Sequence, residues 1–186
     1  VTATNCDTAI WIRDNMLNSN AATVALQINN STNSINGSGI GLLMEGADAS
    51  VGFNGAVPVN FSTSLSKYIR LISNGSNVPA ADVNAQSVQF GGTNGAGLTN
   101  AQLFAVEDKI DHKIDWKALG FVSVKANNDY VTDINAGQSA TNNDYTRIRN
   151  AVEKASNNWT VNLKGSFDWT EANAAASWAL GNDEIA

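Results

Sequence analysis

The stretch INNSTNSINGSGIGLLMEG, residues Ile28 to Gly46, decides how this chain is expected to fold. It alternates Asn, Ser, Thr and Gly with short returns of Ile, Leu and Met. Stacked β-coils have this composition, because Asn amides form ladders along the turns while aliphatic side chains stack inside. The stretch therefore favours a β-solenoid, although such spacing also fits an ordinary β-sandwich.

Similar apolar segments of strand length lie on both sides of this stretch, recurring at intervals of roughly 12 to 20 residues. The predicted strands are TAIWIRDN (Thr8–Asn15), TVALQINN (Thr23–Asn30), GIGLLMEG (Gly39–Gly46), AVPVNF (Ala56–Phe61), YIRLIS (Tyr68–Ser73) and SVQFGG (Ser87–Gly92). Tight two-residue hairpin links are scarce between them, which again favours solenoid coils over a sandwich.

The hydrophobic period changes at TNAQLFAVEDKIDHKIDWKALG, Thr99 to Gly120. A capping box of Thr99 and Gln102 opens a predicted helix, and Gly120 is its expected end. One apolar stripe is expected to consist of Leu103, Val106, Ile110 and Ile114.

Charged side chains of this predicted helix are expected to point outward and to pair one turn apart. They are Glu107, Asp108, Asp111 and Asp115, interleaved with Lys109, Lys113 and Lys117. The single histidine, His112, has no Ser or Cys nucleophile motif beside it, so a surface or capping role is expected.

The C-terminal part is predicted to contain further strands and a second helix. The predicted strands are FVSVKA (Phe121–Ala126), DYVTDI (Asp129–Ile134), WTVNLKG (Trp159–Gly165) and SFDW (Ser166–Trp169). The helix is expected to begin near Asn143 or Asp144 and to end at Asn157 and Asn158. A helix followed by a Val/Leu strand is expected where a helix covers the end of a solenoid.

Other motifs yield no site. Asp168 and Glu171 lie near Trp169 in a pattern that suits a sugar site, but Trp169 and Trp178 are expected to anchor strands instead. The turn GGTNGAG, Gly91 to Gly97, lacks the lysine of a phosphate loop and is interpreted as a flexible lead. Two NNDY sequences, at 127–130 and 142–145, are rich in oxygen but lack the spacing of a calcium loop. We therefore predict no catalytic, cofactor-binding or metal-binding residues, and no enzyme.

Charge and cysteine content narrow the possible partners. A net charge of −6 and a pI near 4.6 argue against nucleic-acid binding, which depends on Lys and Arg. Charged residues make up only 15% of the chain, and this suits an exported β protein. The single cysteine, Cys6, is expected to be a small buried residue. No apolar run approaches the length of a membrane span or follows a basic signal region, so membrane insertion is not expected.

Two segments resemble large bacterial cell-surface proteins of the right-handed parallel β-helix class. Between Ser87 and Thr132 the chain resembles a unit that closes one β-helix, written A-x-E-D-K-I-x-H-K-x-D…L-G-F-V-x-V. Its matching residues are Ala105, Glu107 to Ile110, His112, Lys113, Asp115, Leu119 to Val122 and Val124. The segment from Arg147 to Asp183, which includes FDWTEANAAASWA, resembles the start of the next β-helix. The resemblance implies a tandem extracellular protein of adhesion, matrix or filament construction, without established catalysis.

These patterns predict a mainly β protein of parallel β-helix coils with two helices at a junction. The expected parts are solenoid coils at 1–95, a helix-containing closing unit at 96–134, a linker at 135–143, and a capping helix with the first coils of a second solenoid at 144–186.

The expected function is a structural subunit of an extracellular filament, sheath or surface layer. Its coils would stack head-to-tail on another copy, since an open solenoid end leaves backbone groups unpaired. In one alternative, the C-terminal coils fold back onto the chain's own helices and give a compact monomer. In another, the chain is a β-helix module that binds or cleaves carbohydrate, with a cell-surface glycan as its partner.

Overall fold

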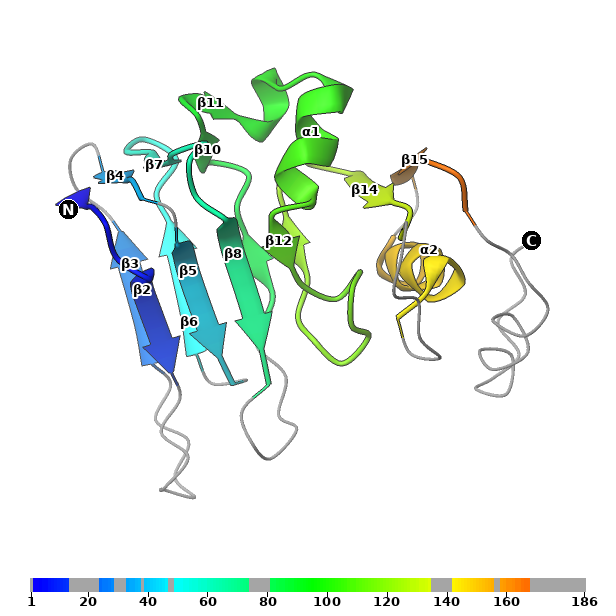
Figure 1. Cartoon of the computed structure of the whole chain (residues 1–186), viewed down its shortest axis with the longest axis horizontal. Coiled ribbons are helices and arrows are strands. Elements are labelled where there is room, and N and C mark those ends of the chain that lie inside the picture. The colour runs from blue at the N-terminus through cyan, green and yellow to red at the C-terminus, as the bar shows by residue number, and fades with distance from the viewer. Residues whose placement is uncertain are drawn as a thin grey trace.

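The structure is a computed structural model, and the residues that it describes are 2–13, 24–28, 33–37, 39–46, 49–73, 81–134, 142–155 and 158–167. Over these residues the protein is mainly β, with parallel sheets and two α-helices, as predicted. In Figure 1 the N-terminal strands lie at one side of the molecule, and α1 and α2 lie toward the other.

As the N-terminal part of the chain proceeds, it adds one strand after another to the same sheets (Figure 1). The first sheet consists, in spatial order, of β1 (Thr2–Ala3), β4 (Asn33–Ile35), β7 (Val59–Phe61), β10 (Gln89–Phe90) and β11 (Thr93–Asn94). The second consists of β12 (Ile110–Asp111), β8 (Lys67–Ile72), β5 (Ile40–Glu45) and β2 (Thr8–Arg13). Two further pairs are β3 (Val24–Ile28) with β6 (Ala49–Phe53), and β9 (Val83–Asn84) with β13 (Val122–Ser123). Only β10 with β11 is antiparallel among these pairs of the described residues.

The strand register places apolar side chains of neighbouring strands next to one another. Ile12 lies beside Met44, and Met44 lies beside Leu71 on the next strand, with all three side chains buried. Ile35, Phe61 and Phe90 form a second buried row across the first sheet. The predicted stacking of apolar side chains between successive parallel strands is thus confirmed for these two rows. Of the Asn residues in the stretch from Ile28 to Gly46 that were expected to form ladders, Asn29 and Asn30 lie outside the described residues, and Asn36 donates to Ser34 Oγ at 3.0 Å.

The first helix is much shorter than predicted. Its start is confirmed: Thr99 caps α1 (Asn100–Glu107) and forms the capping box with Gln102. The expected end at Gly120 is wrong, because Ile110 and Asp111 form β12 and pair with β8 instead. Tyr68 N donates to Lys109 O at 2.8 Å, so strand pairing already begins at Lys109. Burial of Ile110 in a sheet outweighs the helical propensity of the sequence.

The second helix begins and ends close to the predicted bounds. Asn143 caps α2 (Asp144–Lys154), and Thr146 completes its capping box. The helix packs against β14 (Asn128–Thr132) and β15 (Thr160–Lys164), which pair in parallel. A second apolar cluster forms there from Ile114, Phe121, Val131, Ile148 and Ala151. The predicted SFDW strand is wrong at Ser166 and Phe167, which are not in a strand, and its last two residues are not described.

The glycine-rich turn is ordered by packing. Residues 91–97 include β11 and a short 3₁₀ helix, η1 (Gly95–Gly97). A Cβ atom on the buried Gly95 would lie 2.0 Å from Val124 O, so glycine is required for this close approach of two backbones. The interpretation of the whole turn as a flexible lead is therefore wrong.

Cys6 is exposed, contrary to the expected burial. It precedes β2 in the segment that links two edge strands, and its thiol donates only to Thr4 O at 3.4 Å. Neither α1 nor α2, the α-helices of the described residues, has the length and apolar character to span a bilayer.

Candidate assembly interface

Three strands at the N-terminal side, β1, β2 and β3, are the outermost members of their sheets. Within the described residues, each pairs on one side only, with β4, β5 and β6 respectively. They lie together at one side of the molecule in Figure 1. Such edges present unpaired N–H and C=O groups that can pair with another strand.

The register of β2 identifies the backbone groups at this edge. Ile40 N donates to Asp7 O at 2.8 Å, so Asp7 directs its carbonyl toward β5. Because backbone direction alternates along a strand, Thr8, Ile10 and Ile12 direct their N–H and C=O groups to the open side. This edge therefore offers a row of groups in the register of a further parallel strand.

Trp11 is the most prominent side chain on this edge, with 57% of its surface exposed. The guanidinium of Arg13 lies 5.8 Å from the indole centroid and pairs with Glu45 at 3.2 Å. An exposed indole on an edge strand adds apolar area that a neighbour can cover.

The C-terminal side differs, because β15 already pairs with β14 of the same chain. Its five residue pairs run from Asn128 with Thr160 to Thr132 with Lys164. This strand therefore pairs on one side with a strand of its own chain. Leu163 on β15 remains 48% exposed.

The charged residues of the predicted helix do not form an outward row paired one turn apart. Glu107 is buried, and Asp111 in β12 pairs with Lys67 and Arg70 of β8. Asp115 pairs with Arg147 of α2 at 2.9 Å. The lysines also reach distant partners, as when Lys109 Nζ donates to the carbonyls of Thr63 and Leu65 at 2.8 Å. The helix ends at Glu107, so the helical spacing behind the prediction does not exist.

His112 is fully buried, so within the surface or capping role expected for it the surface position is wrong. Its Nε2 lies 2.5 Å from Glu107 Oε1, and Val122 N donates to its Nδ1 at 3.0 Å. Burial lowers the pKa of His112 and the Glu107 carboxylate raises it, with a net rise. A second proton would have to sit on Nδ1, however, where it would face the Val122 N–H. We therefore assign a neutral imidazole that donates from Nε2 to Glu107 and ties α1 to β13.

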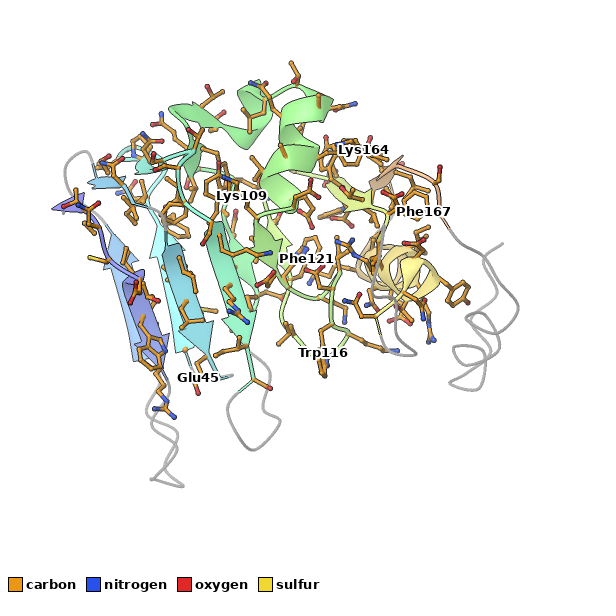
Figure 2. The ribbon with its side chains drawn as sticks, viewed as in Figure 1. Glu45, Lys109, Trp116, Phe121, Lys164 and Phe167 are labelled. Carbon is orange, nitrogen blue, oxygen red and sulfur yellow. The ribbon has the colours of Figure 1, made fainter. Side chains whose placement is uncertain are left out.

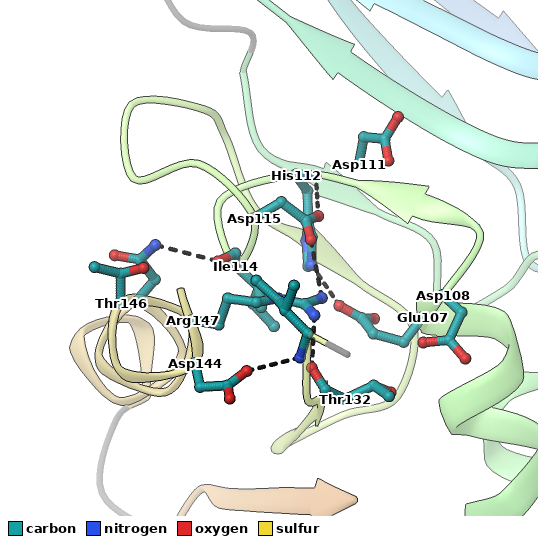
Figure 3. Close-up of polar contacts among 12 residues, drawn as sticks. Glu107, Asp108, Asp111, His112, Ile114, Asp115, Thr132, Asp144, Thr146 and Arg147 are labelled. Atoms are coloured by element: carbon teal, nitrogen blue, oxygen red, sulfur yellow. Dashed lines mark hydrogen bonds and ion pairs between the residues drawn. The ribbon is translucent and has the colours of Figure 1, made fainter. Parts of the chain in front are cut away.

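Arg147 joins α2 to the segments that hold Asp115 and Thr132 (Figure 3). Its Nη1 donates to Thr132 O at 2.5 Å, and its Nη2 donates to Asp115 Oδ1 at 2.9 Å. Asn150 adds a bond to Ile114 O at 3.2 Å, and Asp144 accepts from Ile134 N at 2.7 Å. No local sequence pattern predicts this network, because its members are far apart along the chain.

Asp129 on β14 is buried beside this network, and neither of its carboxylate oxygens has a hydrogen-bond partner. The buried indole N–H of Trp159 likewise has none. Burial raises the pKa of Asp129 to about 6, and the charge of Glu107 adds to the rise. The carboxylate is thus poorly compensated at neutral pH.

The remaining residues considered in the sequence do not converge on a site. Asp168, Trp169, Glu171 and Trp178 lie outside the described residues. The first NNDY sequence enters β14, and Asn143 of the second caps α2. In the described part of the chain, no three His, Cys, Asp or Glu side chains gather as metal ligands.

Comparison of the chain with protein-family models, with curated proteins and with solved structures finds no match.

Proposed function

We propose that the protein is a length of β-solenoid that serves as a structural subunit of an extracellular filament, sheath or surface layer. Each sheet receives a strand from successive turns of the chain, in parallel and with buried side chains in register. This order supports a solenoid over a sandwich, whose sheets are antiparallel. The low content of charged residues, 15%, supports an exported protein.

The observation that carries the proposal is the open edge of β1, β2 and β3. Burying a backbone donor or acceptor without a partner costs about 1 to 3 kcal/mol, whereas an added parallel strand satisfies several at once. Covering the exposed indole of Trp11 contributes further apolar area. We propose that a second copy supplies the added strands, in a head-to-tail contact that grows as an open polymer.

The test uses a proline in β2. Ile10→Pro removes an N–H that faces the open side and leaves pairing with β5 possible, because proline is tolerated in an edge strand. Ile10→Ala removes comparable apolar packing but keeps the N–H, and it is the matched control. We expect concentration-dependent polymers for the unchanged chain and for Ile10→Ala by light scattering and electron microscopy, and a strong reduction for Ile10→Pro.

Amide hydrogen exchange provides the second measurement. Amides of Thr8, Ile10 and Ile12 should become protected in concentrated solution, while amides of β5 should be protected at every concentration. A chain that stays monomeric in concentrated solution, with these three amides still exchanging freely, overturns the proposal.

A further inference from the structure

A cavity of about 380 Å³ lies between the end of β8 and the turn that follows β12. Its polar and aromatic walls are Arg70, Ser73, Asp111, Asp115, Trp116 and Asn142. The volume falls within the range of small-molecule sites in proteins. The cavity is separate from the β1–β2–β3 edge, since it borders the opposite outer strand of the second sheet.

Trp116 is the most exposed large apolar residue among the described residues, at 60%. Figure 2 shows it at the lower rim of the molecule, away from α1. The backbone around it is fixed, because Trp116 N donates to His112 O at 3.1 Å and Leu119 N donates to Trp116 O at 2.9 Å. A flat indole held at the mouth of a cavity can stack on the C–H face of a sugar ring.

The carboxylates of this cavity are held in place by cations. Asp111 accepts from Lys67 at 2.5 Å and faces Arg70 Nε at 3.3 Å. Asp115 accepts from Arg147 Nη2 on one oxygen and from His112 N, at 3.2 Å, on the other. A carboxylate has about four acceptor positions, so both retain capacity for ligand hydroxyl groups.

Arg70 supplies donors to the same cavity. Its side chain is 49% exposed and pairs with Asp111 through Nε. A guanidinium has five N–H donors, so others remain for the oxygens of a ligand. Fixed acceptors, a donor and an aromatic face together match the alternating hydroxyl groups and C–H surface of a sugar.

The charge of the walls selects among sugars. The cations at this cavity are already engaged, Lys67 and Arg70 with Asp111 and Arg147 with Asp115, so the carboxylate of an acidic sugar would have to compete with these aspartates for them. Both carboxylates are engaged with cations, so neither is arranged to donate a proton to a glycosidic oxygen as cleavage requires. We propose that this cavity binds one or two units of an uncharged polysaccharide, with a sugar ring stacked on Trp116, and does not cleave it.

The experiment titrates the full chain with neutral oligosaccharides, namely hexamers of glucan, mannan, xylan and galactan, using oligogalacturonate as the acidic comparison. Isothermal calorimetry and the Trp116 indole N–H signal in NMR report binding. We expect at least one neutral hexamer to bind and oligogalacturonate to bind at least about tenfold more weakly, a difference of about 1.4 kcal/mol.

Trp116→Ala should weaken binding by about tenfold or more, whereas Trp116→Phe should retain part of it. Leu163→Ala is the control, because Leu163 is also an exposed large apolar residue but lies on β15, outside the cavity, and it should bind as the unchanged chain does. Arg70→Ala should weaken binding while the indole signal still responds. Circular dichroism confirms that each variant is folded. Failure of every neutral hexamer to bind, equal binding by Trp116→Ala, or tighter binding of oligogalacturonate overturns the proposal.

Discussion

The N-terminal edge, formed by β1, β2 and β3, and the region around β14 both contain parallel strand pairs. They differ in what covers the outer strands. At the edge, β1, β2 and β3 each pair on one side within the described residues, and Trp11 lies exposed. In the other region, α1, α2 and β15 pack around β14. Buried polar groups gather there, including the His112–Glu107 pair, Arg147 and Asp129.

The difference shows two ways in which parallel strands can end, with an open edge or with helices packed against the strands. Termination places helices against the last strands, and their side chains must then satisfy buried backbone and charged groups. Arg147 does this for the Thr132 carbonyl, and His112 does it for the Val122 amide. A continued edge needs no such side chains, because an added strand satisfies the backbone. Substitutions should therefore affect the two regions unequally.

The largest expected effect on the free energy of unfolding is that of removing Arg147, compared with removing Arg13 at the edge. Arg147→Ala removes the partner of Asp115 and of the Thr132 carbonyl, at a side chain only 10% exposed. We expect a loss of about 3 kcal/mol in the free energy of unfolding. Arg13→Ala at the edge, whose side chain is 52% exposed, should lose no more than about 1 kcal/mol. Urea unfolding of both variants measures the contrast, and equal losses would contradict it.

Asp129 should make stability depend on pH. Its folded pKa of about 6 lies above the ordinary 3.8, so the folded protein binds an extra proton between these values. Stability should therefore rise as the pH falls from about 7 to 5. This window lies above the range in which Asp82 and Glu153, whose pKa values are lowered, lose their ion pairs.

Asp129→Asn tests this assignment. The full rise of the Asp129 pKa corresponds to about 3 kcal/mol, so the variant should be more stable at pH 7.5 by up to that amount and flatter between pH 5 and 7.5. Urea unfolding at both pH values provides the measurement. An unchanged pH dependence in the variant would show that Asp129 is not its source.

Alanine substitutions at Gly95 and Gly55 should differ in their effect on stability, by less than the two arginine substitutions do. Gly95→Ala places a Cβ atom 2.0 Å from Val124 O, and the backbones must separate. We expect a loss of about 1 to 3 kcal/mol. Gly55→Ala, in the turn before β7, meets only Ser87 Cβ at an ordinary 3.7 Å and should change stability by less than about 0.5 kcal/mol. Thermal unfolding compares the two, and similar midpoints would refute the close approach at Gly95.

The smallest expected effect on stability is at Trp11. Trp11→Ala removes an exposed side chain, so the free energy of unfolding of the dilute monomer should change by less than about 0.5 kcal/mol. Its association in concentrated solution should nevertheless weaken, because the indole lies on the proposed contact. A large loss of stability in dilute solution would indicate that Trp11 supports the fold itself.

Local pattern predicted the six N-terminal strand segments and both helix starts, because these features depend on neighbours in the sequence. Capping boxes such as Thr99 with Gln102 span one turn, and apolar clusters reveal strands directly. Short strands were missed, among them β4, β6 and β9, because two to five residues with few apolar side chains give no clear period. The helix end failed because the pairing of Ile110 with Ile69 depends on a residue far away.

The candidate sites were less predictable than the fold. Trp11 and Trp116 are exposed, and the amino-acid composition does not indicate which tryptophans are exposed and which are buried. The row of charged residues was recognised, but its partners were not, since Lys67, Arg70 and Arg147 come from β8 and α2.

The sequence by itself determined a mainly β chain of short, regularly returning apolar strands, two capped helices and a low charge, because these properties depend on local spacing and composition. Tertiary structure alone decided that Glu107 and His112 are buried together, that Asp115 holds Arg147, and that β15 pairs with β14. Each of these contacts joins groups whose energies depend on burial and on distant partners, and the local sequence specifies neither.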